Sequence, residues 1–456
     1  MHLRELYVKM LVIGGYMRNF EFGEKLYRYR KLAKLSQQEL ASNFGITNKA
    51  ISKWENGEAY PSLPQLVKLA KLYGVSLDEL VNKSNNQQKQ TYKIAITGGP
   101  CSGKSTALSW LQSDFRKKGF MVMFVPETAT ELILGGISYD TIDDNYNFEK
   151  SIIKLQIEKE KVFEEAAKHI VGYDKVLIIC DRGVMDCKAY TTDLEFKRIL
   201  KELNTNEIAL RDSYDAVFHL VTAAKGAAEF YNLQNAARRE SLEEAIDADD
   251  RTLNSWIGHP HLRVIDNSTD FERKMRRLVG EITEFVGTDK PYEIERKFLI
   301  EYPNLEKLEK LPNCSKVEII QTYLKSDKDT ETRVRQRGQN GYYTYTKTIK
   351  TKVSDMKRIE LESRISQEEY LNCLLEADLS IGQIRKTRYC LTHKNKYLEI
   401  DVYPFWQDKA ILEIELNNEK EKFEFPKFIN PIKEVTGNKD YFNSTLAKLS
   451  KQYLNS

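Results

Sequence analysis

The spacing of apolar side chains changes twice along the chain and divides it into three segments. The first places apolar residues three and four positions apart, which predicts short amphipathic helices. The second alternates short apolar runs with helical stretches, and the third alternates apolar and charged residues at every second position. A polar run without periodicity ends the first segment, and Gly287 and Pro291 end the second. The predicted boundaries are 18–83 for an all-α domain, 84–91 for a linker, 92–287 for an α/β domain and 290–456 for an α+β domain of antiparallel strands.

Composition narrows the classes of function. A chain of 456 residues exceeds one hydrophobic core, and none of its apolar runs is long enough to span a bilayer. The six cysteines show no metal-ligand spacing, so we expect reduced thiols and a cytoplasmic location. A net charge of +3 means that any polyanion must be bound by a local patch. The residues before Met17 read as an extension, so translation starts at Met1 or Met17.

The first segment has the spacing of two helices joined by a tight turn. Ser36 and Thr47 are each placed to cap a helix, and Gly45 permits the turn between them. Ile51 and Trp54 are then expected to face inward. The opposite side of the second helix carries polar and basic side chains, the types that contact base edges and phosphates in a major groove. The candidate DNA-contacting residues are Gln37, Thr47, Asn48, Lys49, Ser52 and Lys53.

Residues 23–81 resemble the Cro/C1 (Xre-type) repressor family, including the motif ISKWENG at the end of the recognition helix. Residues 17–83 contain eleven Lys and Arg and seven Asp and Glu. This excess of positive charge suits contacts with phosphates. The resemblance implies binding to operator DNA as a homodimer on two half-sites. A helical bundle that mediates only protein contacts is the alternative interpretation.

The second segment contains Gly-x-x-x-x-Gly-Lys-Ser between an apolar strand and a helix. Backbone N–H groups of such a loop surround a phosphate, the lysine reaches the terminal phosphates and the serine hydroxyl ligates Mg²⁺. Asp181 ends a later apolar strand, where it can hold the Mg²⁺ shell or, alternatively, cap a helix. The predicted nucleotide-binding residues are Gly98, Gly99, Pro100, Cys101, Ser102, Gly103, Lys104, Ser105, Thr106 and Asp181, with Ser105 and Asp181 as metal ligands.

A charged helical stretch between the fourth and fifth predicted strands lies where small-molecule kinases have a lid. Arg238, Arg239 and Arg251 are candidates to close over a phosphoryl group, and a solvated charged helix is the alternative. Glu127 either positions an acceptor hydroxyl or braces the phosphate loop. About five strands favour a doubly wound parallel sheet. The domain resembles the AAA_28 group of P-loop proteins, similar to nucleoside kinases, through GGPCSGKST, PETAT, DRGVMD, ARRE and VIDNST; ATP and GTP both remain open as ligands.

In the predicted strands of the third segment, every second residue tends to be charged, and both signs occur. In a single strand such a pattern indicates a solvated face. Repeated over five or more strands, it favours a closed or nearly closed barrel with a polar lumen. Cations there suit the oxygens of a polyphosphate, and carboxylates hold hard divalent cations. The pattern occurs in YEIERKFLI, ETRVRQRG, RIELES, LEIDVY and ILEIELN.

Residues 292–450 resemble the CYTH superfamily, the triphosphate tunnel metalloenzymes, whose signature Glu-x-Glu-x-Lys falls on Glu293, Glu295 and Lys297. The resemblance implies an eight-stranded antiparallel β tunnel, Mg²⁺ or Mn²⁺, and inorganic or organic triphosphates as substrates. The family includes adenylyl cyclases, but hydrolysis is the simpler expectation because cyclisation also needs a positioned ribose hydroxyl. By this resemblance the catalytic residues are Glu293, Glu295, Lys297, Arg333, Arg335, Lys347, Lys386 and Arg388, and the metal ligands are Glu293, Glu295, Asp401, Glu413 and Glu415, with Glu362 as a helper.

The order of a P-loop domain followed by a CYTH domain resembles the TRPL translocation defect protein, a resemblance that implies binding of GTP and of anionic phospholipids. Two functions from different classes remain open. In one, the tunnel hydrolyses triphosphates beside a P-loop domain that is an NTPase or a kinase. In the other, both domains bind ligand and the chain is a nucleotide- or polyphosphate-responsive regulator. No amphipathic anchor or strong basic cluster stands out, so a membrane lipid is not expected as a partner.

Overall fold

The computed structural model divides the chain into two compact units, Met1–Gln90 with Ala167–Val176, and Thr91–Ala166 with Leu177–Ser456. In the described part of the chain, no helix has both the length and the apolar character needed to cross a membrane. All six cysteines are unpaired. The structure describes residues 20–33, 35–73, 75, 77, 80, 90–142, 144–228, 241–287, 295–326, 330–354, 357–416 and 423–454.

The N-terminal domain is a helical bundle with α2 (Phe20–Leu32), α3 (Gln37–Phe44), α4 (Asn48–Glu55) and α5 (Leu63–Tyr73). Both predicted caps are confirmed. Ser36 accepts a hydrogen bond from the Glu39 N–H at 3.1 Å, and Thr47 accepts one from the Ala50 N–H at 3.3 Å. Gly45 ends α3 with a φ of 63°, a left-handed conformation that glycine adopts without strain. The core contains Phe22, Leu26, Leu40, Ala41, Ile51, Trp54, Leu66, Leu69, Ala70 and Leu80.

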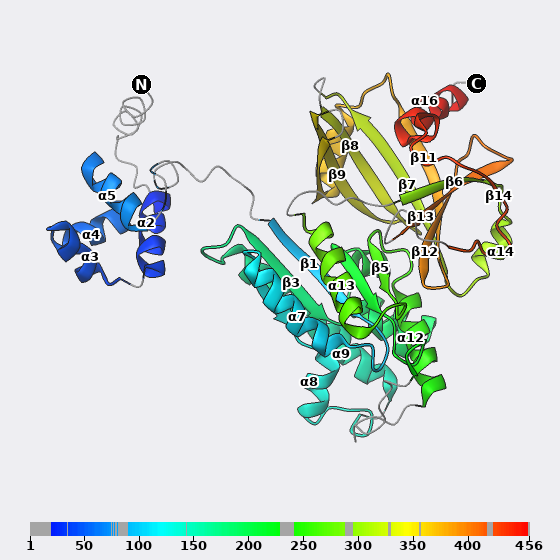
Figure 1. Ribbon diagram of the computed structural model, residues 1–456, viewed down its shortest axis with the longest axis horizontal. Coiled ribbons are helices and arrows are strands. Elements are labelled where there is room, and N and C mark those ends of the chain that lie inside the picture. The colour runs from blue at the N-terminus through cyan, green and yellow to red at the C-terminus, as the bar shows by residue number, and fades with distance from the viewer. Residues whose placement is uncertain are drawn as a thin grey trace. The chain divides into compact units, whose positions relative to one another are not determined.

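The central domain is a five-stranded sheet with strand order β2-β3-β1-β4-β5, in which β4 pairs in parallel with β1 and β5 (Figure 1). Buried apolar residues of α7 and α13 pack on the sheet and bury one of its faces. The predicted α/β domain with a parallel sheet is confirmed. The elements are β1 (Gln90–Thr97), α7 (Lys104–Lys117), β2 (Met121–Val125), α8 (Thr128–Leu134), α9 (Asn145–Lys168), β3 (Lys175–Asp181), η1 (Val184–Tyr190), α10 (Asp193–Glu202), α11 (Glu207–Arg211), β4 (Ala216–Leu220), α12 (Leu242–Ser255), β5 (Leu262–Ile265) and α13 (Phe271–Phe285).

The C-terminal domain is an antiparallel sheet with strand order β10-β9-β8-β7-β11-β12-β13-β6-β14. The resemblance implied eight strands, and the described residues form nine, because the short β14 pairs with the edge of β6 that β13 leaves open. The elements are β6 (Glu295–Glu301), α14 (Leu305–Glu309), β7 (Cys314–Leu324), β8 (Thr330–Gln339), β9 (Tyr342–Ser354), β10 (Lys357–Ile365), α15 (Gln367–Leu374), β11 (Gln383–His393), β12 (Lys396–Val402), β13 (Lys409–Glu415), β14 (Pro431–Glu434), η3 (Lys439–Tyr441) and α16 (Asn443–Leu454).

The strand register separates an apolar face of this sheet from a charged one. Directly opposite residues of an antiparallel pair point to the same side. Lys297 lies opposite Glu413, and Arg388 lies opposite Asp401, so charged residues of β6, β11, β12 and β13 share one face. The other face forms a core with α14 that includes Phe298, Ile300, Leu308, Ile400, Leu412 and Ile414.

Candidate functional site

Cations and carboxylates on the charged face of the C-terminal sheet pair with one another. Arg388 donates to Asp401 through Nε and NH2, both at 2.7 Å, and to Glu413 through NH2 at 2.6 Å. Its NH1 group also donates to Glu399. Lys386 donates to Asp401 at 2.5 Å. One guanidinium therefore joins carboxylates from β12 and β13, and Asp401 is wholly buried beneath it.

A single ammonium joins two of the predicted metal ligands. Lys297 Nζ lies 2.8 Å from Glu295 Oε1 and 2.7 Å from Glu413 Oε1. Burial and the neighbouring Glu413 raise the pKa of Glu295 to about 7. Burial opposes ionisation of Glu413 too, but Arg388 and Lys297 outweigh it and lower the pKa of that carboxyl. The same cation therefore faces one carboxyl whose pKa is raised and one whose pKa is lowered.

The arginines of β8 share the charged face of the sheet. Burial lowers the pKa of the Arg335 guanidinium, Glu362 opposes this effect, and the nearby cations Arg333 and Arg388 add to it. Three guanidinium groups near one another repel, and an anion bound among them relieves that repulsion. Arg333 and Arg335 are therefore placed where a phosphate chain would be held.

The prediction of Lys347 as a tunnel lysine is wrong. Lys347 lies opposite Val334, which is fully buried in the apolar cluster on the other face of the sheet. Thr348 lies opposite Arg333 and shares its face, and Lys350, two residues further, shares it as well. Because strand side chains alternate, a shift of one residue changes the face, and the lysine on the charged face is Lys350.

Arg337 lies on the same face of β8 as Arg333 and Arg335, but its side chain contacts the central domain. Its guanidinium donates to Asp212 at 3.0 Å and to the backbone carbonyl of Gly258. The Tyr397 hydroxyl donates to the carbonyl of His259 at 3.1 Å and accepts from the N–H of Gly258 at 3.2 Å. These contacts lie within the second compact unit, and they commit Arg337 to the neighbouring domain instead of a ligand.

The described carboxylates fit a divalent cation in part. Glu295 and Glu413 supply the oxygen ligands that Mg²⁺ and Mn²⁺ prefer, and one ammonium already lies between them. Asp401, predicted as a ligand, has both oxygens engaged by cations, so it holds those cations in place. Glu293 and the side chain of Glu415 lie outside the described residues. Within the described residues, no group of three or more His, Cys, Asp or Glu is arranged to hold a metal.

The phosphate loop of the central domain folds around its own lysine. Lys104 Nζ donates to the carbonyls of Gly98 and Gly99 at 2.9 and 3.1 Å and to the Ser102 hydroxyl at 3.3 Å. Burial and the nearby Arg182 lower the pKa of Lys104 to about 8. The ammonium is thus held at the centre of the loop, where a phosphate would replace the carbonyls as its partner.

Two glycines of this loop are required by its geometry. Gly98 has a φ of 142°, and a Cβ there would lie 2.1 Å from the Leu220 carbonyl oxygen. Gly103 has a φ of 92°, and a Cβ there would lie 2.7 Å from the Phe271 ring. The remaining predicted loop residues are Pro100 and Cys101 in the turn and Ser105 and Thr106, exposed in the first turn of α7.

Asp181 ends β3 beside the loop with an unsatisfied oxygen. Its Oδ1 is buried and has no hydrogen-bond partner in the described part of the chain. Burial and the nearby Glu127 raise the pKa of this carboxyl, which Lys104 opposes. The helix-cap alternative does not hold, because Gly183 is the N-cap of the following η1. A buried carboxylate oxygen without a partner, beside a phosphate loop, fits a Mg²⁺ shell.

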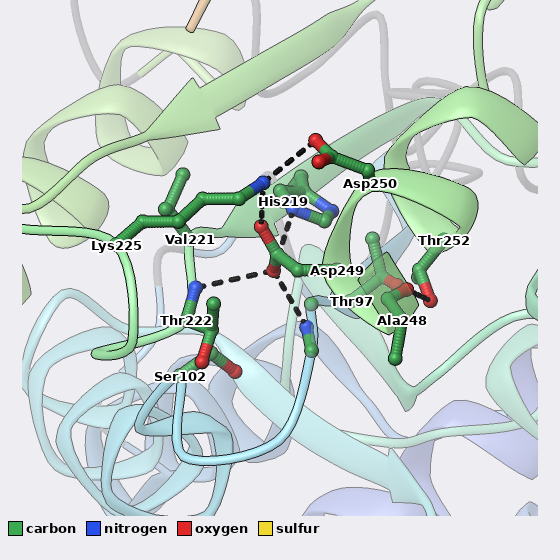
Figure 2. A network of polar contacts seen from close by, with 12 residues as sticks. Thr97, Ser102, His219, Val221, Thr222, Lys225, Ala248, Asp249, Asp250 and Thr252 are labelled. Carbon is green, nitrogen blue, oxygen red and sulfur yellow. Dashed lines mark hydrogen bonds and ion pairs between the residues drawn. The ribbon is translucent and has the colours of Figure 1, made fainter. Parts of the chain in front are cut away.

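Sequence reasoning missed Asp249 of α12, a fully buried carboxylate that holds the loop in place (Figure 2). Its Oδ1 accepts from the N–H of Gly99 at 2.9 Å and of Thr222 at 3.1 Å, and lies 3.1 Å from His219 Nε2. Lys225 donates to Oδ2 at 2.9 Å. Burial opposes ionisation, but His219 and Lys225 lower the pKa of Asp249, so it stays charged. The available signal was the small-residue stripe Ala245, Ala248, Thr252, which marks the buried side of α12.

Arg182 is a second residue that the sequence analysis missed. Its guanidinium donates to Glu127 at 2.6 Å and to Asp186 at 3.1 Å. Asp186 also accepts from the Thr97 hydroxyl at 2.7 Å and from the Trp256 indole at 2.5 Å. Glu127 is therefore held by an arginine that lies near the loop lysine.

Among the predicted lid arginines, the structure describes Arg251. Arg238 and Arg239 lie outside the described residues. The Arg251 side chain is 52% exposed and forms an ion pair with Asp247 at 3.1 Å on the same helix. That placement is typical of a solvated helix face.

The N-terminal domain exposes much of the predicted recognition helix. Thr47 is used as the cap of α4. Gln37 donates to Glu55 at 2.7 Å, and Glu55 also accepts from Arg30 at 2.6 and 2.9 Å, so Gln37 belongs to a network between helices. The exposed or partly exposed candidates on α4 are Asn48, Lys49, Ser52 and Lys53.

Comparison with known families agrees with these three sites. Residues 26–80 match the family model described as helix-turn-helix, residues 93–274 the AAA domain and residues 291–433 the CYTH domain. The chain carries a helix-turn-helix, an AAA and a CYTH domain. Its first domain is a DNA-binding domain and its second a P-loop nucleotide-binding domain. The CYTH domain is a triphosphate tunnel domain.

The N-terminal domain is also similar to curated regulators. It is 40% identical over 62 residues to the HTH-type transcriptional activator BcrR of Enterococcus faecalis, covering 14% of this chain and 30% of BcrR. It is 41% identical over 66 residues to the prophage-derived regulator YonR of Bacillus subtilis, covering 14% of this chain and 61% of YonR. It covers 85% of the HTH-type regulator MJ0272 of Methanocaldococcus jannaschii, and 12% of this chain, at 38% identity over 56 residues. The N-terminal domain belongs to this helix-turn-helix family, and the chain spans less than two thirds of the length of the first two regulators.

Solved structures include similar chains. The inorganic triphosphatase NE1496 is 26% identical to this chain and has a TM-score of 0.26. The match covers 34% of this chain and 94% of the NE1496 chain. The PH1819 protein of Pyrococcus horikoshii OT3 is 25% identical, covers 28% of this chain and 80% of its own, and has a TM-score of 0.22.

Proposed function

We propose that the CYTH domain binds and hydrolyses a short triphosphate with Mg²⁺ or Mn²⁺. The observation that carries this proposal is the mutual pairing of Lys297, Lys386 and Arg388 with carboxylates in one buried cluster. A triphosphate and a divalent cation can replace these pairs together, because the anion takes the cationic groups and the cation takes the carboxylates. Separate binding of either ligand leaves buried charge of the other sign without a partner, which is costly.

Unsatisfied groups in the same domain support a ligand of this kind. The Thr346 hydroxyl lies opposite Arg335 on the charged face, is buried, and has no hydrogen-bond partner among the described residues. Native proteins rarely leave such a group without a partner. A phosphate oxygen would accept from it.

The residues divide the work of hydrolysis between them. Arg333, Arg335 and Arg388 hold the nonbridging oxygens and neutralise charge that develops on the leaving phosphate. A divalent cation, when bound, polarises the phosphoryl group and activates water. The water oxygen forms a bond to the terminal phosphorus, the bond from that phosphorus to the bridging oxygen breaks, phosphate and diphosphate leave, and the proton that water loses passes to solvent.

We expect phosphate release from tripolyphosphate that requires Mg²⁺ or Mn²⁺ and stops on chelation. The pKa of Glu295 is about 7, so below pH 7 this carboxyl carries a proton that the metal must displace. The half-saturating metal concentration should rise by up to about tenfold for each pH unit below 7, and level off above it. Colorimetric phosphate release at several metal concentrations between pH 5.5 and 8.5 measures this dependence.

Phosphate release that persists in EDTA would contradict a metal-dependent tunnel. Tight binding of tripolyphosphate without any release would support the alternative in which the domain only senses its ligand. Comparing tripolyphosphate with ATP and GTP distinguishes inorganic from nucleoside triphosphates as substrates.

We propose further that the chain is a regulator that binds operator DNA as a homodimer and responds to nucleotide or triphosphate. The exposed lysines of α4 favour DNA binding over a purely protein-binding bundle. Equilibrium DNA binding with and without ATP, GTP or tripolyphosphate tests the response. If no ligand changes the affinity for DNA, the proposed coupling fails while DNA binding stands.

The double variant Lys49→Ala/Lys53→Ala should weaken binding to mixed-sequence duplex DNA. Each lysine that contacts a phosphate contributes about one unit to the slope of log affinity against log salt, so the slope should fall by about two. Fluorescence anisotropy over a salt series measures it. Lys68→Ala, an exposed lysine on α5, is the control and should leave the slope unchanged. An unchanged slope in the double variant would argue that α4 does not face DNA.

A further inference from the structure

Tyr403 follows β12 and continues the parity of Glu399 and Asp401, which face the charged cluster. The residue is 1% exposed, and its hydroxyl is buried without a hydrogen-bond partner in the described part of the chain. The Lys386 ammonium lies 6.0 Å from the centroid of its ring. The ring of a tyrosine whose hydroxyl is buried therefore lies near a predicted phosphate-binding lysine.

Tyr403 differs in this respect from the other fully buried tyrosines. The Tyr389 hydroxyl donates to Glu309 at 2.9 Å, and the Tyr214 hydroxyl to Glu160 at 2.5 Å. The Tyr323 hydroxyl accepts from Gln321 at 2.8 Å. Since buried polar groups are nearly always hydrogen-bonded, the hydroxyl of Tyr403 indicates a partner outside the part of the chain that the structure describes.

The carboxylates that surround Tyr403 are already occupied. Both oxygens of Asp401 accept from Lys386 and Arg388, and both oxygens of Glu413 are engaged by Lys297 and Arg388. A tyrosine hydroxyl carries its proton at neutral pH and can act as a donor. A ligand that is drawn to this place by cations and supplies acceptor oxygens is an anion.

We propose that the Tyr403 hydroxyl is a substrate-binding group that donates a hydrogen bond to a nonbridging oxygen of the bound triphosphate. This inference rests on the proposed function of the CYTH domain. The ring is fixed by packing against Ile384, Ile411 and Leu446, so the donor is preorganised for the ligand. The phosphate that it contacts is the one held by Lys386.

The test is Tyr403→Phe in the full chain, which removes the hydroxyl and keeps the ring. Calorimetric titration with tripolyphosphate and Mg²⁺ should show an affinity about tenfold lower than that of the wild type. In steady-state hydrolysis KM should rise while kcat changes little, as for a contact made equally in ground and transition states. The melting temperature should stay the same or rise, because the substitution deletes a buried group that lacks a partner.

Tyr389→Phe is the matched control. It removes a hydroxyl bonded to Glu309 on the apolar side of the sheet, so it should lower the melting temperature and leave tripolyphosphate affinity unchanged. Wild-type affinity in Tyr403→Phe would overturn the inference. A lower melting temperature with unchanged affinity would assign Tyr403 a structural role and overturn it too. Failure of the wild-type chain to bind tripolyphosphate would instead refute the proposed function.

Discussion

Replacing Lys104 with alanine should lower the affinity of the full chain for Mg²⁺-ATP or Mg²⁺-GTP by about 100-fold or more. The Lys104 ammonium lies within the described phosphate loop, bonded to Gly98, Gly99 and Ser102. A nucleotide phosphate would replace these neutral acceptors with charged ones, and charge-assisted hydrogen bonds contribute about 1.5–3 kcal/mol each. Titration with fluorescent analogues of ATP and GTP measures the loss and shows which nucleotide the wild type prefers.

Lys117→Ala is the control for this substitution, because Lys117 is exposed on the same helix and carries the same charge. Its nucleotide affinity should equal that of the wild type. The melting temperature of Lys104→Ala without ligand checks that the loop still folds. If Lys104→Ala binds nucleotide as the wild type does, the P-loop is not the nucleotide site.

Local signals in the sequence were sufficient for much of the fold. Ser36, Gly45 and Thr47 set the ends of helices through their own side chains or backbone freedom, so short-range chemistry predicted the turn. The alternation in the C-terminal segment assigned Lys297, Glu413 and most of their neighbours to one face, because strand side chains alternate strictly. Both signals act within a few residues.

The remaining features depend on contacts between distant residues. Lys347 and Lys350 both lie in one strand rich in threonine, and only the pairing with β8 shows which of them shares the face of Arg333. Asp249 lies 150 positions from Gly99, the residue whose N–H it accepts, in a helix whose many acidic residues read as a solvated face. The small-residue stripe of α12 indicates the buried side of the helix, but only its partners show that Asp249 holds the phosphate loop.

Arg296 is another residue whose partner is distant in the sequence. It is a charged residue on the apolar parity of β6, which the alternating pattern does not account for. The structure pairs it with Glu434 on β14 at 2.6 and 2.9 Å and places it over the rings of Phe298 and Phe423. The ninth strand, which no pattern near Arg296 predicts, supplies its partner.

Glu413→Gln should abolish most of the metal-dependent phosphate release while sparing the binding of the anion. The carboxylate is 8% exposed and lies between Lys297 and Arg388, so the isosteric amide keeps its volume and removes one negative charge. Loss of a metal ligand, or of a residue that positions a metal ligand, should reduce kcat/KM for tripolyphosphate by about 100-fold or more. Without metal, the same variant should bind tripolyphosphate as well as the wild type or more tightly. The carboxylate of Glu413 competes with the anion for Lys297 and Arg388, and the substitution removes this competitor.

This opposite response of hydrolysis and metal-free binding separates a metal ligand from a residue that only maintains the fold. A structural defect would weaken both quantities and lower the melting temperature. Glu318→Gln makes the same exchange at an exposed position on β7 and should change neither quantity. If Glu413→Gln hydrolyses tripolyphosphate at the wild-type rate, the charged cluster is not the site of hydrolysis. If it loses metal-free binding as well, the carboxylate organises the cations instead of holding the metal, because Lys297 and Arg388 would then depend on its charge for their positions.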